Sequence, residues 1–313
     1  TVEEELVSIF TKRFNDYFAD NLYTHDNVGV LLSGGIDSAN LLSFLKKDNK
    51  KILAYTWGGW GEKTTDVIYS KYTVKKFGVD KHSIILKDDN YKKEEDMFID
   101  LIKKIKIPLN FRTAIPYIFM KKEILNDNIK IVLNGQNADT LFMSYMAPVK
   151  AFKILRKTSD LLLNPILLMA CFKSSGLWKY VKFNKKYLKE LYDIYQPISK
   201  LKISLQRKII LCEEIYTEAR YCQNHQKKIL EYDTNIKVLN PYYDKQFINY
   251  CLSASDEIRG KDNFNKSPLY VFARKNGVPA EVINKPKKGL SYGYKDFLEK
   301  KMHLPIWKEI MED

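Results

Sequence analysis

Residues 28–38 read Val-Gly-Val-Leu-Leu-Ser-Gly-Gly-Ile-Asp-Ser, and this stretch decides the fold of the chain. Its first five residues are apolar or glycine with no polar alternation, which is typical of a strand covered on both faces in a parallel sheet. Leucines then recur at helical spacing within residues 39–45, and Asp37 and Ser38 take the expected N-cap and first turn. The stretch therefore predicts a strand, a glycine turn and a helix in direct succession.

A strand, a tight glycine turn and a helix start together form a site for an anion. Backbone N–H groups without helical partners converge there, and the helix dipole favours negative charge. Gly34 and Gly35 allow the backbone to approach a ligand closely. The loop is not of the Gly-x-x-x-x-Gly-Lys-Ser/Thr type, and Gly-x-Gly-x-x-Gly occurs nowhere in the chain. For a bare Gly-Gly turn, the alternative is an ordinary connection between strand and helix.

Strand and helix patterns alternate along the first half of the chain. The expected elements are helices at residues 3–18, 66–77 and 115–125, strands at 28–32, 51–57, 84–86 and 130–133, and loops at 58–61 and 108–112. Such alternation is typical of a doubly wound parallel sheet, in which ligands bind at the carboxyl ends of the strands. The predicted fold class is therefore α/β, with the loops after the first two strands converging on one site.

The second half of the chain differs in pattern and charge. Apolar stripes at 161–171 and 201–216 predict that residues 151–313 form a mainly helical portion, which completes the active site beside an α/β core at residues 1–150. The net charge is +14, and residues 151–313 carry 30 Lys and Arg against 18 Asp and Glu. A basic half suits a nucleic acid or another acidic polymer, but solvated lysines explain it more simply. We do not expect a nucleic-acid partner on charge alone.

Other compositional features indicate a globular protein of the cytoplasm. A membrane-spanning helix needs an apolar run of about 18 residues, and every apolar run in the chain is much shorter. Residues 1–15 lack the pattern of a secretory signal. The cysteines have no Cys-x-x-Cys spacing, so we expect buried thiols rather than metal ligands. They are Cys171, Cys212, Cys222 and Cys251.

Four motifs, in the expected order, resemble those of the asparagine synthetase family. Ser33–Ser38 resembles the pyrophosphate-binding loop of the N-type ATP pyrophosphatases. Residues 131–145, Ile-Val-Leu-Asn-Gly-Gln-Asn-Ala-Asp-Thr-Leu-Phe-Met-Ser-Tyr, resemble the family's Gly-Glu-Gly-Ala-Asp-Glu-Leu-Phe-Gly-Gly-Tyr. Val238–Asp244 is similar to Arg-Val-Pro-Phe-Leu-Asp, and Asn284–Leu290 to Arg-x-Lys-x-Gly-Phe. The resemblance implies the adenine nucleotide alpha-hydrolase-like fold, which beta-lactam synthetase-like relatives share.

The resemblance also implies a reaction, that of an ATP-dependent amide-bond-forming ligase. A substrate carboxylate would attack the α-phosphorus of ATP, pyrophosphate would leave into the loop, and ammonia or an amine would displace AMP. Asp37 and Asp139 would hold Mg²⁺, which prefers carboxylate and phosphate oxygens, and the cation of Lys287 would stabilise developing negative charge. The implied ATP and pyrophosphate contacts are Leu32, Ser33, Gly34, Gly35, Asp37, Ser38, Tyr55, Thr56, Trp57, Gly135 and Lys287.

Each of these side chains also has a simpler interpretation. An isolated aspartate after a glycine turn is most often a helix N-cap, and Lys287 stands beside Lys285 and Lys288 as a surface lysine would. The glycine loops and the motif positions favour the functional interpretation of Asp37 and Asp139, and motif position favours the catalytic interpretation of Lys287.

Departures from the family pattern lie in the second and fourth motifs. Gln136 stands where asparagine synthetases have Glu, and a neutral amide cannot take a proton from an attacking amine. Thr140 replaces a second Glu, and Lys285 replaces the usual Arg. Glu214 and Glu218 are weak candidates for a displaced base, since carboxylates on such a helix mostly form a solvated face. We therefore expect a specialised biosynthetic enzyme that adenylates a carboxylate other than aspartate.

The source of the nitrogen is also expected to differ. The chain begins with Thr1 and reaches the Ser-Gly-Gly loop within 35 residues, so we expect no glutaminase domain with an N-terminal Cys nucleophile. Ammonia would then come from a separate donor protein, or the nucleophile would be an amine on the substrate.

Three other readings of the sequence are possible. A tRNA-modifying ATP pyrophosphatase would share the Ser-Gly-Gly loop and suit the basic half, but that group lacks the motif around Asp139. A catalytically degenerate binding homologue is favoured only by Gln136. Gly289–Gly293 fits the Gly-x-Ser-x-Gly of hydrolases, yet the residues before it are lysines and proline instead of an apolar strand.

Overall fold

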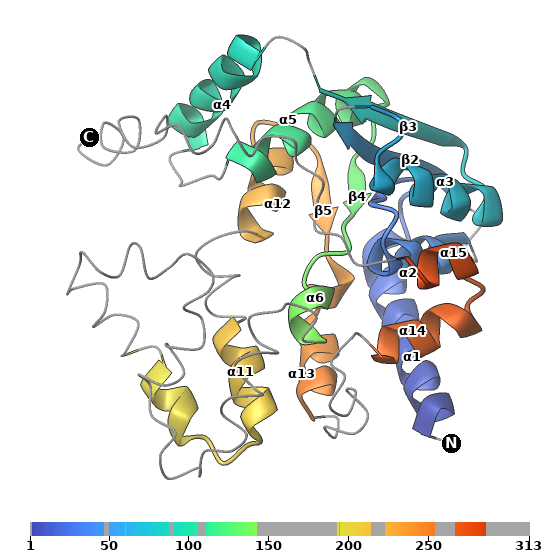
Figure 1. Ribbon diagram of the computed structural model, residues 1–313, viewed down its shortest axis with the longest axis vertical. Coiled ribbons are helices and arrows are strands. Elements are labelled where there is room, and N and C mark those ends of the chain that lie inside the picture. Colours follow the sequence, from blue (N-terminus) through green and yellow to red (C-terminus); the bar gives the residue numbers. More distant parts are fainter. Residues whose placement is uncertain are drawn as a thin grey trace. The chain divides into compact units, whose positions relative to one another are not determined.

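The computed structural model describes residues 2–46, 50–59, 61–87, 91–105, 111–142, 193, 195–213, 223–253 and 267–285 (Figure 1). Contacts divide the chain into two compact units. The first contains the described residues within 1–136, 221–244 and 269–313, and the second contains those within 137–220 and 245–268. The parallel sheet lies in the first unit.

The first unit is built on a five-stranded parallel sheet in the order β3-β2-β1-β4-β5. Its strands are β1 (Asn27–Leu31), β2 (Lys51–Gly59), β3 (Lys81–Leu86), β4 (Ile131–Leu133) and β5 (Lys237–Leu239). Val28 pairs with Ile52 of β2, and Val30 pairs with Leu133 of β4. The chain builds outward from β1 first in one direction and then in the other, which confirms the predicted doubly wound α/β fold.

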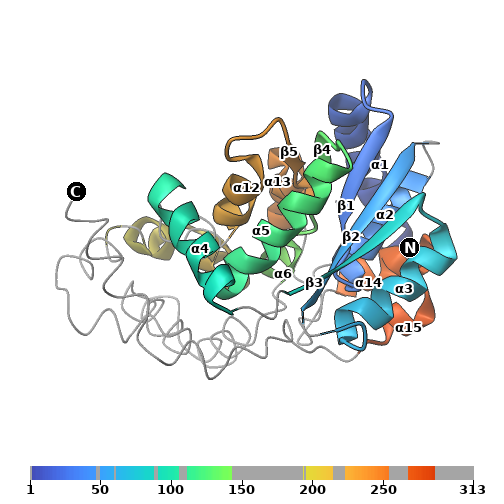
Figure 2. The same cartoon turned by 90° about the horizontal axis from the view of Figure 1, so that it is seen from above.

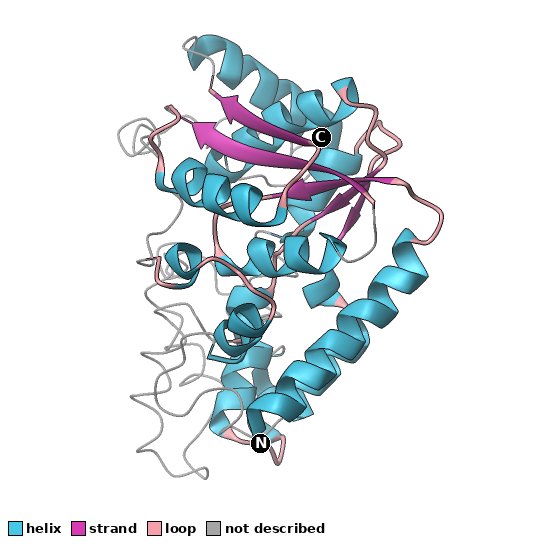
Figure 3. Ribbon diagram, turned by 90° about the vertical axis from the view of Figure 1, so that its right-hand side faces the viewer, coloured by secondary structure: helices cyan, strands magenta, loops and turns pink. Residues whose placement is uncertain are grey.

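Helices of this unit cover both faces of the sheet (Figures 2 and 3). One layer holds α1 (Val2–Leu22), α2 (Ile36–Leu45), α3 (Thr65–Phe77), α14 (Ser267–Lys275) and α15 (Ala280–Ile283). The other holds α4 (Tyr91–Ile105), α5 (Phe111–Asn126) and α12 (Gln223–Glu231). Because both faces are covered, the central strands contain apolar residues at successive positions.

Aromatic side chains form the core beneath α1. The ring centroids of Phe14 and Phe44 are 5.1 Å apart, and the ring of Phe44 stacks on Phe272 at 5.2 Å. All three side chains are buried. On the other face, Tyr55 and Val132 pack with apolar residues of α5 and α12. The helix expected at residues 3–18 is confirmed, and its apolar face lies against Phe44 of α2 and Phe272 of α14.

Several element boundaries differ from the sequence expectation. Gly58 and Gly59 are not in a flexible loop, because β2 continues through both residues. Of the loop expected at 108–112, Phe111 and Arg112 already belong to α5, and the rest lies outside the described residues. Helix α4 and strand β5 were not predicted; β5 adds a strand to the half of the chain that was expected to be mainly helical.

The second unit is helical in its described part. It contains α6 (Ala138–Leu141), α11 (Leu205–Glu213) and α13 (Lys245–Ser253). Ile209, Ile210 and Phe247 are buried, and the Lys208 ammonium donates to the carbonyl of Ser199 at 3.0 Å. The stripe at 161–171 and the boundary at residue 150 lie outside the described residues.

Two expectations about composition concern described residues. Cys251 of α13 is buried, as expected for a structural thiol. Among the helices that the structure describes, none combines the length and apolarity needed to cross a membrane.

Candidate active site

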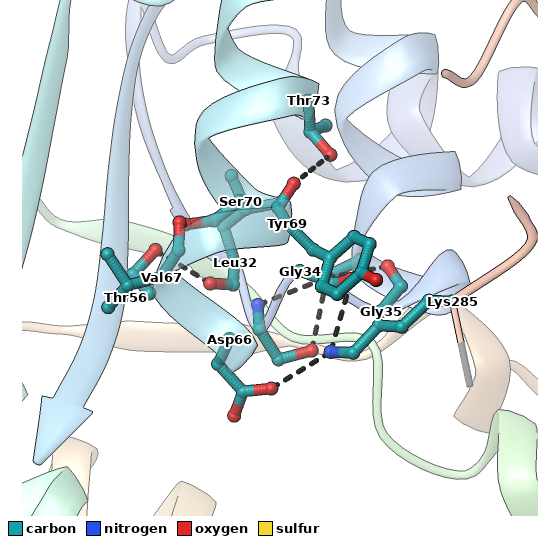
Figure 4. Close-up of polar contacts among 12 residues, drawn as sticks. Leu32, Gly34, Gly35, Thr56, Asp66, Val67, Tyr69, Ser70, Thr73 and Lys285 are labelled. Carbon is teal, nitrogen blue, oxygen red and sulfur yellow. Dashed lines mark hydrogen bonds and ion pairs between the residues drawn. The ribbon is translucent and has the colours of Figure 1, made fainter. Parts of the chain in front are cut away.

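Buried polar groups tie the carboxyl ends of β1 and β2 together (Figure 4). The Leu32 N–H donates to the carbonyl of Tyr55 at 2.8 Å, and the Thr56 hydroxyl donates to the carbonyl of Leu32 at 2.7 Å. His82 Nε2 lies 2.9 Å from Thr56 Oγ1. Since the hydroxyl proton points to Leu32, the imidazole must donate through its Nε2–H. Burial, and then the charge of Lys71, lowers the pKa of His82, so the ring is held neutral near pH 7.

The side chains of Tyr55 and Trp57 are used for packing. The Tyr55 hydroxyl donates to Asp127 Oδ2 at 2.9 Å, and burial together with this carboxylate raises the pKa of Tyr55 far above its ordinary value. The Trp57 ring lies 5.9 Å from the ring of Phe119 on α5. What the end of β2 can offer a nucleotide is therefore backbone, as the family resemblance implies for these two positions.

Serine hydroxyls close the loop between β1 and α2. The Ser33 N–H donates to Ser38 Oγ at 3.2 Å, and the Ser38 hydroxyl donates to the carbonyl of Gly35 at 3.2 Å. The two hydroxyl oxygens are 3.3 Å apart. The loop expected at Ser33–Ser38 thus bends back on the first turn of its own helix, which fixes its shape before any ligand arrives.

Position 34 requires glycine for two reasons, its backbone φ angle and the lack of room for a Cβ atom. Its φ is +64°, in the left-handed region. A Cβ at this position would lie 2.6 Å from the carbonyl oxygen of Asp66 and 2.8 Å from the amide nitrogen of Ser70. The loop therefore rests directly on the backbone of α3, at a distance that no side chain allows.

Helix α2 begins at the loop with an open N-terminus. Its N-cap is Gly35, which has no side chain to bond the first N–H groups, and Asp37 follows in the first turn instead of at the N-cap. The Tyr242 hydroxyl donates to the backbone carbonyl of Asp37 at 3.1 Å, and Tyr242 is fully buried. Tyr242 belongs to the motif at Val238–Asp244, so that motif stabilises the start of α2 through this hydrogen bond.

The second motif approaches the same helix start through its glycine. A Cβ on Gly135 would lie 3.1 Å from the amide nitrogen of Ser38 and 3.3 Å from Asp37 Cβ. The next side chain, Gln136, lies with Nε2 3.4 Å from the hydroxyl of Tyr117. Within the described part of the chain, the side-chain oxygen of Gln136 is buried and has no hydrogen-bond partner. The sheet thus brings the residues after β1 and β4 together, at the point where its strand order reverses.

Lys285 is a residue of this site that sequence reasoning did not select. Its Nζ lies 3.0 Å from Asp66 Oδ1 and 3.4 Å from the carbonyl oxygen of Gly34 (Figure 4). It also lies 5.2 Å from the centre of the Tyr69 ring. The available signal was its motif position, since the family has Arg there and both residues carry a cation.

Some predicted residues are not brought together by the structure. Asp139 lies in the first turn of α6, in the second unit, so its pairing with Asp37 at one metal ion stays a prediction. Lys287, Glu214 and Glu218 lie outside the described residues, and their roles also stay predictions.

The site residues fit the chemistry of ATP and magnesium. Within the described ranges, no three His, Cys, Asp or Glu side chains gather as a metal cluster. Magnesium bound beside a nucleotide needs no such cluster, because one or two carboxylates and substrate phosphates suffice. Asp37 supplies a carboxylate next to the Gly35 end of α2, and that helix end suits phosphate.

Comparison with known proteins gives one family over nearly the whole chain. The model of the asparagine synthase family matches residues 10–313. That range includes all four motifs and every site residue named above.

Individual proteins similar to this chain are named as asparagine synthetases. The glutamine-hydrolyzing asparagine synthetase 1 of Bacillus subtilis is 28% identical over 149 residues, which are 46% of this chain and 22% of that protein. The glutamine-hydrolyzing asparagine synthetase of Rattus norvegicus is 21% identical over 286 residues, which are 90% of this chain and 42% of that protein. The chain thus spans less than half the length of these relatives.

Proposed function

The chain belongs to the asparagine synthase family, and from this premise we propose that it is an ATP-dependent carbon–nitrogen ligase. The observation that carries the proposal is the packing of Gly135 on Asp37 and Ser38. It joins the two nucleotide motifs of the family at the reversal point of the sheet, where parallel sheets bind their ligands.

The proposed first step activates a carboxylate. An oxygen of the substrate carboxylate attacks the α-phosphorus of ATP, the bond from that phosphorus to the bridging β-oxygen breaks, and pyrophosphate leaves with the bond electrons. Residues Ser33–Ser38 receive the pyrophosphate through backbone N–H groups at the start of α2. Magnesium, held by Asp37 and Asp139, would neutralise charge on the phosphates.

The proposed second step forms the amide. The nitrogen of ammonia or of an amine attacks the carbonyl carbon of the acyl-adenylate, the bond to the AMP oxygen breaks, and the nitrogen gives up a proton. Lys287, by its position in the Asn284–Leu290 motif, would stabilise the charge that develops on the phosphate and the tetrahedral intermediate. A separate protein that delivers ammonia, or an amine within the substrate, would supply the nitrogen.

We further propose that the acyl substrate is not aspartate. Gln136 stands where asparagine synthetases carry Glu, and its amide can accept a hydrogen bond from an amine but cannot remove a proton. Its contact with the Tyr117 hydroxyl adds no basic group, because a phenol at neutral pH is protonated. The base must then be a different group, such as Glu214 or Glu218, or the amine must enter the reaction already neutral.

Product analysis tests the reaction class. Purified protein is incubated with ATP, Mg²⁺, an amine and a panel of carboxylates that includes amino acids, peptides and sugar acids. We expect AMP and pyrophosphate in equal amounts with a productive carboxylate, and their loss in Asp37→Asn. ADP and inorganic phosphate as products would contradict the proposal.

The same assay separates the proposed ligase from the tRNA-modifying alternative. If AMP release required RNA in place of a small carboxylate, the second reading would replace the first. The match to the asparagine synthase family over residues 10–313 favours the ligase.

A further inference from the structure

Lys285 is enclosed by groups of the first unit. Its side chain is 11% exposed and that of its partner Asp66 is 18% exposed, with 3.0 Å between Nζ and Oδ1. The carbonyl oxygen of Gly34 and the face of the Tyr69 ring complete its surroundings (Figure 4). An ammonium and a carboxylate shielded to this degree attract each other more strongly than a pair at an exposed surface. Lys285 is thus fixed at the phosphate loop instead of extending into water.

The contact with Gly34 has a geometric consequence for the next residue. The carbonyl of Gly34 and the N–H of Gly35 belong to one planar peptide unit, and the described chain contains no cis peptide bond. In a trans peptide these two groups point in opposite directions. A carbonyl held toward Lys285 therefore turns the Gly35 N–H away from Lys285, at the N-cap of α2.

We propose that Lys285 is a positioning residue for pyrophosphate binding, which acts by fixing the orientation of the Gly34–Gly35 peptide. Asp66 holds the ammonium of Lys285, the ammonium holds the carbonyl of Gly34, and the Gly35 N–H is directed at the pyrophosphate. This inference rests on the proposed function, because it assigns pyrophosphate to the Ser33–Ser38 loop. It gives Lys285 a task distinct from that of Lys287.

Close packing of the loop on α3 supports this role for a single cation. A Cβ at Gly34 would lie 2.6 Å from the carbonyl oxygen of Asp66, so the backbone of Gly34 lies close to α3. Asp66 and Tyr69 of the same helix also contact Lys285. A rotation of the Gly34–Gly35 peptide would take the carbonyl away from Lys285, and the bond from Lys285 opposes that rotation.

Calorimetric titration of the whole chain with inorganic pyrophosphate and Mg²⁺ tests the proposal. Lys285→Met should weaken pyrophosphate binding about 10-fold or more, because it removes a charge-assisted hydrogen bond on which the loop depends. Lys285→Arg should restore the affinity to within about 3-fold, since guanidinium can bond the same two oxygens. Thermal unfolding of each variant verifies that it is folded.

Asp66→Asn separates positioning from simple charge attraction. Removal of a carboxylate near the loop would strengthen the binding of an anion if only Coulomb attraction mattered. Positioning predicts the reverse, weaker binding, because the ammonium of Lys285 loses its anchor. Glu62→Gln is the matched control: it makes the same change in charge at a carboxylate that is 62% exposed and paired with Lys71, and should leave pyrophosphate affinity unchanged.

The outcomes distinguish this inference from the proposed function. If the unsubstituted chain binds pyrophosphate but Lys285→Met binds it equally well, or Asp66→Asn binds it more tightly, the positioning role is wrong and the ligase proposal stands. If the unsubstituted chain binds neither pyrophosphate nor ATP, the proposed function is wrong and the inference falls with it.

Discussion

The first and second motifs follow neighbouring strands of one sheet, yet they differ in how they are built. Ser33–Ser38 matches the pyrophosphate loop in full and is held by serine hydroxyls, by the backbone of α3 and by Lys285. The second motif keeps Gly135, which packs on Asp37, but carries Gln136 where a Glu is usual. The packing of the first motif therefore supports the proposed nucleotide chemistry, whereas the second motif departs from the family pattern at the position proposed to act on the amine.

This contrast teaches which of the two regions tolerates change. A Cβ at Gly34 would lie within van der Waals distance of the α3 backbone, so this position of the nucleotide loop resists substitution. Among the residues that the structure describes, the polar contact of the Gln136 side chain is with the hydroxyl at the tip of Tyr117, at 3.4 Å. Such a position accepts a new side chain without disturbing the sheet, and it can set the chemistry of a different reaction.

Gly34→Ala should break the first region most severely. The left-handed φ costs about 1 kcal/mol or more for alanine, and the Cβ would collide with Asp66 and Ser70 backbone atoms. We expect pyrophosphate affinity, measured by calorimetry, to fall about 100-fold or more. Gly78→Ala is the matched control, because Gly78 has a φ of +68° but its Cβ would lie 3.8 Å from the nearest atom, Lys46 Cε.

The two glycine variants should distinguish the cost of backbone strain from the loss of pyrophosphate binding. Gly78→Ala should lower the unfolding free energy without changing pyrophosphate affinity, since it pays only the backbone cost. Equal affinity in Gly34→Ala and the unsubstituted chain would contradict the close packing of the loop on α3.

Thr56→Val should have an intermediate effect. It removes the hydroxyl that donates to the Leu32 carbonyl and accepts from His82, so two buried partners lose a hydrogen bond. We expect a loss of about 1–3 kcal/mol in the free energy of unfolding by urea and a raised Kd for ATP. Thr73→Val is the control. Thr73 is also buried, and among the described residues its hydroxyl donates to the carbonyl of Tyr69 in its own helix, so the ATP affinity should stay unchanged.

His82 should give the smallest effect, a dependence of stability on pH. Its pKa in the folded protein is lowered by burial first and by Lys71 second, so the unfolded chain binds the proton more readily. The stabilisation is complete above the unfolded pKa of about 6.5 and declines as the pH falls below it, by at most about 1.4 kcal/mol per pH unit.

Urea unfolding at pH 7.5 and pH 5.5 measures this dependence. His82→Gln should reduce the difference between the two midpoints. A pH dependence that is the same in the unsubstituted chain and in His82→Gln would show that other groups are responsible.

Much of the fold could be predicted because its signals are local. An uninterrupted apolar run followed by Ser-Gly-Gly and a leucine helix predicts β1, the loop and α2 from neighbouring residues alone. Strand β5 could not be predicted in this way, because it has three residues and owes its place to pairing with β4. The sequence pattern places Gly58 in a loop, but a Cβ there would lie 2.8 Å from Leu86 Cδ2, so Gly58 serves close packing of β2 and β3.

The same limit applies to the candidate site. Motif positions predicted the loop, Gly135 and the strand ends, because the resemblance carried them. The contact of Lys285 with Asp66 joins residues 219 positions apart, and no local pattern indicates such a pair. The N-cap of α2 also differs from the expected residue. It is Gly35 and not Asp37, because the helix begins two residues earlier, directly after the glycine turn.

We propose that this chain keeps the nucleotide chemistry of its family and applies it to a carboxylate other than aspartate. The most direct test is the rate of asparagine formation from aspartate, ammonia, ATP and Mg²⁺, measured for the unsubstituted chain and for Gln136→Glu. We predict that the unsubstituted chain makes asparagine far more slowly than about 1 s⁻¹ and that Gln136→Glu, which restores a base at this position, makes it faster. Asparagine formation by the unsubstituted chain at about 1 s⁻¹ or more would contradict the claim.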